Sequence, residues 1–222
     1  ACLGRVAGKM SPNETLIERT SLLEQLMTTG GGWQDQVGGI TPGVKLIRTR
    51  PGADQTPSLH WTGLGHGTAT PWSDSLLLYF TGQKRLARNI LQNVVGRYLA
   101  RDPDALDTIE RLKHGAEQMK RDLDVGDFHA FGQGVDEYWR LKKRFDPGAT
   151  NPKIEAIIEP LEDLLIGKLL PGAGGGGFVF MVAKDDQAAR RIRKRLLAQP
   201  PNPLARFFEF DIDRIGLSVT VL

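Results

Sequence analysis

GGGWQDQVGG, residues 30–39, is the stretch from which the fold and the function of this chain are best inferred. Five of its ten residues are glycine, and glycine lets a backbone adopt positive φ and approach a ligand closely. One carboxylate, Asp35, lies among them with an amide on either side, Gln34 and Gln36. A carboxylate in such a loop can take a proton from a substrate hydroxyl, while the amides supply neutral hydrogen bonds. The residues alone leave a second interpretation open, a turn with a helix-capping Asp.

Hydrophobic periodicity outward from this stretch predicts that strands and helices occupy separate parts of the chain. Apolar residues recur every three or four positions in the helical segments, whereas the strands are short apolar or alternating runs. The predicted fold class is therefore α+β. We expect helices over residues 11–28, 86–99, 105–123, 128–138, 154–164 and 186–198, and strands over residues 44–49, 58–62, 76–80 and 178–183, with a final antiparallel pair at 207–212 and 215–221.

A second glycine run, GAGGGG at residues 172–177, formally matches G-x-G-x-x-G. The dinucleotide-binding form of that motif follows a strand and opens a helix. Here we expect a helix before the run and a strand after it, and no Gly-Lys-Ser/Thr follows. Neither a Rossmann site nor a Walker A loop is predicted. Two interpretations of this glycine run remain: a tight entry into the strand, or close packing against another loop.

Composition excludes several classes of protein. The net charge is +3, from 29 basic and 26 acidic residues, which is too small to indicate a nucleic-acid partner. One cysteine excludes an internal disulfide framework and fits a reducing compartment. The longest apolar run, residues 178–183, is far shorter than the roughly 18 residues of a membrane span, and the histidines lack zinc-ligand spacing. We therefore expect a cytoplasmic protein with no nucleic-acid partner, no membrane contact and no metal ligands in this chain.

Three segments together resemble the L-fucokinase branch of the GHMP sugar kinases. The first is residues 24–45, which contains GGGWQDQVGG followed by Thr-Pro-Gly-Val-Lys. The second, residues 81–91, is similar to the strand-to-helix junction of those enzymes, and the third, residues 172–178, is similar to the third GHMP motif. Their order and spacing also fit, which makes the resemblance more specific than either glycine run.

The resemblance implies a two-domain α+β kinase. Residues 1–72 would be the remainder of the N-terminal domain, and residues 73–222 a ferredoxin-like C-terminal domain with added helices. The family's phosphate loop would lie upstream of Ala1, so the groups that hold the ATP phosphates and Mg²⁺ are expected mostly in that N-terminal segment of the same protein. Residues 1–222 alone are then expected to be inactive.

For function, the resemblance implies ATP-dependent phosphorylation of the anomeric hydroxyl of L-fucose, giving fucose 1-phosphate. Asp35 matches the catalytic Asp of this branch, and the sugar and ATP would be the small-molecule partners. The residues expected to bind the sugar are Gly31, Gly32, Trp33 and Gln34. Those expected to support the ATP loop are Gly172, Ala173, Gly174, Gly175, Gly176 and Gly177.

Two alternatives remain open at this point. Gly126-Asp127 with Phe128, and Trp139 with Lys142, also resemble heptose 7-phosphate kinases, whose second phosphate would demand a Lys or Arg cluster. The other alternative is a binding module that keeps the kinase fold without catalysis; the presence of Asp35 speaks against it. The sequence leaves open whether a nucleotidyltransferase domain is fused to the kinase, and the oligomeric state.

Overall fold

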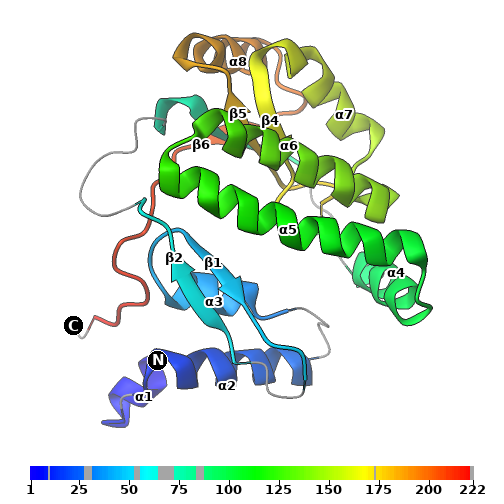
Figure 1. Cartoon of the computed structure of the whole chain (residues 1–222). Coiled ribbons are helices and arrows are strands. Elements are labelled where there is room, and N and C mark those ends of the chain that lie inside the picture. The colour runs from blue at the N-terminus through cyan, green and yellow to red at the C-terminus, as the bar shows by residue number, and fades with distance from the viewer. Residues whose placement is uncertain are drawn as a thin grey trace. The chain divides into compact units, whose positions relative to one another are not determined.

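The computed structural model describes residues 1–9, 11–27, 32–52, 56–64, 73–83, 88–172 and 174–220 (Figure 1). The chain divides into two compact units. Residues 1–67 and 212–222 form the first unit, and residues 68–211 form the second. The assignment of residues 1–72 and 73–222 to two family domains stays a prediction.

The first unit combines helices with a two-stranded hairpin. Val37 and Ile40 are buried together with Ile17, and Ile47 and Leu59 of the hairpin pack against them. Figure 1 shows α3 behind the hairpin, as this cluster requires. The strands pair antiparallel from Lys45 opposite Trp61 to Arg48 opposite Ser58. The elements are α1 (Cys2–Val6), α2 (Asn13–Leu26), α3 (Gln34–Ile40), β1 (Lys45–Arg48) and β2 (Ser58–Trp61).

The second unit is built on a four-stranded antiparallel sheet in the order β4-β5-β3-β6. Helices α5 and α6 run side by side, and α6 packs along β4 (Figure 1). The strands are β3 (Leu76–Phe80), β4 (Leu165–Leu169), β5 (Phe178–Ala183) and β6 (Arg206–Phe208). The α-helices are α4 (Arg88–Leu99), α5 (Pro103–Val125), α6 (Phe128–Phe145), α7 (Pro152–Ile158) and α8 (Asp186–Ala198).

The largest hydrophobic cluster of this unit lies on one face of the sheet. Alternate residues of β3 and β5 point inward, because successive side chains of a strand face opposite sides. They pack against apolar residues of α7 and α8 and against Trp139 of α6, which is fully buried. The inward residues of the two strands are Leu77, Tyr79, Val179, Met181 and Ala183.

Local signals determine where the long helices begin and end. The Asp102 carboxylate caps α5 by accepting from two backbone N–H groups, and Pro103 occupies the first turn. Gly126 ends α5 with φ of 77°, a left-handed conformation that suits glycine, and Asp127 caps α6. The residues that suggested a heptose kinase at Gly126-Asp127 thus form a helix-to-helix turn.

The structure corrects two expected elements. The helix expected over 154–164 ends at Ile158 and continues as a 3₁₀ helix, Glu159–Leu164, because Pro160 lacks an N–H and its ring crowds the preceding turn. The expected final antiparallel pair does not form. β6 pairs with β3 instead, and residues 209–220 form no strand.

Residues 213–217 are tied to the end of α3, within the first unit. The N–H of Leu217 donates to the Ile40 carbonyl at 3.0 Å, and the N–H of Gly43 donates to the Asp213 carbonyl at 2.8 Å. The α+β class is confirmed by the mixture of helices and antiparallel sheet. None of the helices in the described ranges has the length and apolarity that crossing a membrane requires.

Candidate functional site

Asp35 lies in the first turn of α3, and its side chain is exposed. This differs from the expected glycine-rich loop, because Gly38 and Gly39 are inside the helix rather than in a turn. Glycine disfavours helix. The helix forms because Val37 and Ile40, three residues apart on one face, are buried.

The Asp35 carboxylate has no hydrogen bond or ion pair to any residue that the structure describes. A carboxylate near a helix N-terminus is stabilised by the helix macrodipole. Its oxygens are therefore available to a ligand that approaches from solvent.

The residues around Asp35 divide into exposed and buried groups. Gly32 and Gln34 are exposed and Trp33 is half-buried, whereas Gln36 is 5% exposed. The Oε1 atom of Gln36 is buried without a hydrogen-bond partner among the described residues. Gln34 is thus placed to reach a ligand and Gln36 is not. Gly31 lies outside the described residues.

The C-terminal end of α3 is fixed by Lys45. Its Nζ donates to the carbonyl oxygens of Thr41, Pro42 and Gly43 at 2.7, 3.2 and 3.1 Å. Burial lowers the pKa of Lys45, while Asp213 opposes this shift. The indole N–H of Trp61 also donates to the Pro42 carbonyl, at 3.1 Å. The Thr-Pro-Gly-Val-Lys sequence therefore anchors the helix that carries Asp35.

The glycine run forms the connection between β4 and β5. A strand precedes it, not the helix that the sequence predicted. Four glycines have positive φ, a conformation that L side chains rarely adopt. Ala173 lies outside the described residues. The four glycines are Gly172, Gly174, Gly175 and Gly177, with φ of 67°, 84°, 71° and 84°.

The second half of this loop is bonded to two other segments. The N–H of Gly175 donates to the Ala149 carbonyl at 2.6 Å, and Asn151 Nδ2 donates to the Gly175 carbonyl at 2.9 Å. The N–H of Gly177 donates to the Gln83 carbonyl at 2.8 Å. The structure thus brings together residues 81–83 and 172–177, two of the three segments that carried the family resemblance.

The first half of the loop is held by Lys142, which sequence reasoning did not connect with it. Its Nζ donates to the carbonyl oxygens of Leu170 and Gly172, each at 2.6 Å. Burial lowers the pKa of Lys142 to about 8, although Asp146 raises it. The only local signal was the position of Lys142 among basic residues in the last turn of α6. Basic residues at that position commonly interact favourably with the helix macrodipole.

Each of the two units contains at least one cavity. One, of about 880 Å³, lies beside α2 and is lined by Trp33 and Trp61 together with Glu14 and Glu18. Aromatic walls with a few polar groups are typical of small-molecule sites. Asp35 is not among its lining residues.

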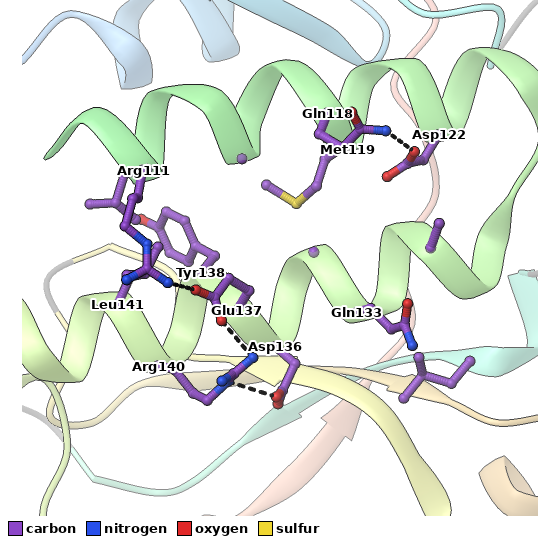
Figure 2. Close-up of a pocket in the computed structure, with 15 residues that line it drawn as sticks. Arg111, Gln118, Met119, Asp122, Gln133, Asp136, Glu137, Tyr138, Arg140 and Leu141 are labelled. Atoms are coloured by element: carbon purple, nitrogen blue, oxygen red, sulfur yellow. Dashed lines mark hydrogen bonds and ion pairs between the residues drawn. The ribbon is translucent and has the colours of Figure 1, made fainter. Parts of the chain in front are cut away.

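A second cavity, of about 700 Å³, lies between α5 and α6 (Figure 2). Its charged groups bind one another. Arg111 and Arg140 both pair with Glu137, at 2.6 and 2.5 Å, and Gln118 donates to Asp122 at 2.7 Å. These charged and polar groups are therefore already bonded to one another, and we assign no ligand to this cavity. Among the described residues, no three or more His, Cys, Asp or Glu side chains form a group that could hold a metal ion.

Comparison with known proteins supports the resemblance to GHMP kinases. The sequence profile described as GHMP kinases C terminal matches residues 113–202. Over 205 residues the chain is 43% identical to L-fucokinase/L-fucose-1-P guanylyltransferase from Bacteroides fragilis. This alignment covers 92% of the present chain and 22% of that protein. Residues 113–202 thus match the C-terminal domain of the GHMP kinases. The chain is also 38% identical, over 184 residues, to the bifunctional fucokinase/GDP-fucose pyrophosphorylase of Arabidopsis thaliana, covering 83% of this chain and 17% of that protein.

Solved structures of similar fold agree with this match. A putative sugar kinase from Campylobacter jejuni superimposes with a TM-score of 0.69 at 20% identity, over 96% of this chain and 58% of that one. Lactococcus lactis galactokinase complexed with galactose superimposes with a TM-score of 0.65 at 14% identity, over 95% of this chain and 62% of that one. These likenesses concern the fold. The chain spans about a fifth of the length of the curated relatives that it matches.

Proposed function

We propose that the protein containing this chain transfers a phosphoryl group from ATP to the anomeric hydroxyl of L-fucose. The observation that carries the proposal is the 43% identity, over 92% of the chain, to a relative named L-fucokinase/L-fucose-1-P guanylyltransferase. The second relative, at 38% identity, is also named a fucokinase. Both names join the kinase to formation of a sugar nucleotide.

Asp35 is the proposed catalytic residue. It accepts the proton of the sugar O1 hydroxyl as O1 forms a bond to the γ-phosphorus, and the bond from that phosphorus to the bridging oxygen breaks to release ADP. An exposed carboxylate without a partner among the described residues supports this role, because its lone pairs are free to meet the hydroxyl. The proton then passes to solvent when the product leaves.

The sugar-binding and ATP-supporting residues are also proposals. Gly31, Gly32, Trp33 and Gln34 precede Asp35 directly, and Trp33 borders the cavity of about 880 Å³. Residues 172–177 would support the loop that holds the ATP phosphates. In this proposal the ligands of those phosphates lie outside the present chain. Among the described residues, no group of His, Cys, Asp or Glu side chains could hold a Mg²⁺ ion.

The heptose 7-phosphate kinase alternative loses part of its basis. Gly126 and Asp127 form a helix-to-helix turn, Trp139 is core, and Lys142 binds loop carbonyls. These residues are committed to the fold of the second unit and do not form a phosphate-binding cluster.

A substrate panel tests the proposal. The full-length protein is incubated with ATP-Mg and L-fucose, D-galactose or heptose 7-phosphate, and phosphate placement is read by NMR. We expect L-fucose to be preferred and to carry the phosphate at O1. Preference for heptose 7-phosphate would support the alternative kinase, and no turnover of any sugar would support a binding module.

A further inference from the structure

The loop between β4 and β5 is bonded to the rest of its unit at both ends. Thr81, Gln83, Ala149 and Asn151 hold the half from Gly175 to Gly177 through backbone and amide groups. The half from Leu170 to Gly172 is held differently, by a single side chain that is charged and comes from another element.

That side chain is Lys142, in the last turn of α6. Its two carbonyl partners, Leu170 and Gly172, lie 28 and 30 residues later in the sequence. The distances of 2.6 Å are those of charge-assisted hydrogen bonds, which are stronger than bonds between neutral groups. The ammonium also lies 5.9 Å from the centre of the Trp139 ring. It forms no ion pair within the described residues, so its hydrogen-bonding capacity is directed at the loop.

The groups around Lys142 account for its orientation. Trp139 is fully buried, and its ring lies beside the ammonium group of Lys142. Asp146 is the acidic group whose charge acts on the ammonium. The loop carbonyls supply the hydrogen bonds that a partly buried cation requires. The charge of Lys142 is therefore solvated by the loop carbonyls, and these contacts restrain the loop.

Gly172 adds a reason for this contact. Its φ of 67° lies in the left-handed region, and glycine is the residue with the most conformational freedom. A bond to its carbonyl oxygen restricts the peptide that follows. Without it, the first half of the loop would have few restraints.

We propose that Lys142 is a positioning residue of the kinase, which holds the first half of the glycine loop in the shape that the ATP site needs. The proposal rests on the proposed function, in which this loop supports the ATP-binding loop. Lys142 touches neither ATP nor sugar in this scheme and acts only through the carbonyl oxygens of Leu170 and Gly172.

Lys143 offers a matched control. It is the next residue of α6, and its ammonium also lies over the Trp139 ring, at 5.4 Å. Its ion-pair partner is Glu155, at 3.3 Å, and it does not contact the loop. Lys142→Met and Lys143→Met each remove one positive charge beside the same ring. Only Lys142→Met also removes hydrogen bonds to the loop carbonyls.

The test uses the full-length protein with both variants. Hydrogen exchange of peptides covering residues 170–177 reports the loop, and calorimetry reports ATP affinity without requiring any sugar. Because hydrogen bonds to a charged group are lost, we expect Lys142→Met to speed loop exchange and to weaken ATP binding, each by ~10-fold or more. Lys143→Met should leave both near wild type, and exchange in α8 should be unchanged in both variants. If Lys142→Met does not fold, Lys142→Arg replaces it, since a planar guanidinium cannot reproduce the contacts of a compact ammonium.

The outcomes separate this proposal from the proposed function. Unchanged loop exchange in the Lys142 variant, or equal effects of the two variants, would overturn the positioning role. A looser loop with unchanged ATP affinity would overturn it as well. If the wild type binds ATP but phosphorylates no fucose, the substrate assignment fails while the comparison of ATP affinities still decides the role of Lys142. A wild type that binds no ATP contradicts both.

Discussion

Thr81 donates two hydrogen bonds to the carbonyl oxygen of Gly177, one from its backbone N–H and one from its hydroxyl, both at 2.9 Å. Thr81 follows β3 directly and is fully buried, and Gly177 precedes β5. A third residue completes the junction, because Asn202 Nδ2 donates to the Thr81 carbonyl at 2.7 Å. The strand end, the glycine loop and the segment before β6 thus meet at one threonine.

Thr81→Val tests this junction. Valine keeps the shape but removes the hydroxyl, which donates to the Gly177 carbonyl and accepts from the Gln83 N–H at 3.3 Å. The backbone bond to Gly177 remains. We expect a loss of ~1–3 kcal/mol in the free energy of unfolding, the usual net value of two such hydrogen bonds. Urea unfolding measures it. Thr20→Val is the control: its hydroxyl donates to the Leu16 carbonyl at 2.7 Å at an exposed site, where changes stay within ~0.5 kcal/mol. Equal losses would show that the buried bonds are not special.

Gly174→Ala and Gly172→Ala separate backbone conformation from close packing. Both residues have positive φ, and a left-handed conformation costs a non-glycine residue ~1–2 kcal/mol. A Cβ at Gly174 would also collide with the Ala149 carbonyl, whereas one at Gly172 would have no neighbour within 4 Å. We expect the Gly174 variant to lose a further ~1–3 kcal/mol, the range for overpacking. Thermal unfolding in parallel measures the difference, and identical melting temperatures would contradict the predicted collision.

The depressed pKa of Lys142 predicts a pH dependence of stability. Its pKa is about 8 in the folded protein against 10.5 for an unperturbed lysine. Between these values the unfolded chain binds more protons than the folded one, so the contribution of Lys142 to stability rises with pH and is constant below about 8. The slope for one proton is at most ~1.4 kcal/mol per pH unit.

Urea unfolding of the wild type and of Lys142→Met at several pH values isolates this contribution. The difference in stability between them should shift in favour of the wild type as the pH rises from 8 to 10.5. Lys143→Met should follow the wild type. A difference that stays constant over this window would mean that Lys142 titrates normally.

Asp35→Asn tests the proposed chemistry in the full-length protein. Asparagine keeps the size of the side chain and caps helices well, but cannot accept the proton. We expect kcat to fall by ~10²–10⁴-fold, with KM and the melting temperature little changed. Asp74→Asn, at an exposed first-turn position of a 3₁₀ helix, should leave kcat unchanged. If the Asp35 variant keeps more than about half of the wild-type rate, Asp35 is not a general base.

The sequence by itself determined the features that depend on a few neighbouring residues. Asp102-Pro103 and Gly126 bound a helix because caps, proline and glycine act within one turn. Four of the glycines at 172–177 adopt positive φ for the same reason. The family resemblance followed from three short segments, and with it the choice of Asp35 as the candidate base.

Tertiary structure alone decided what lies next to these segments. Asp35 is helical because Val37 and Ile40 are buried against the hairpin, a gain that outweighs the poor helix propensity of the neighbouring glycines. β6 pairs with β3, whereas the alternating pattern at 215–221 suggested a strand of its own. Lys142 reaches a loop about thirty residues away, and no local pattern encodes such a contact. Propensities and caps are properties of a short segment, but pairing and solvation of a buried charge depend on which distant groups packing brings near.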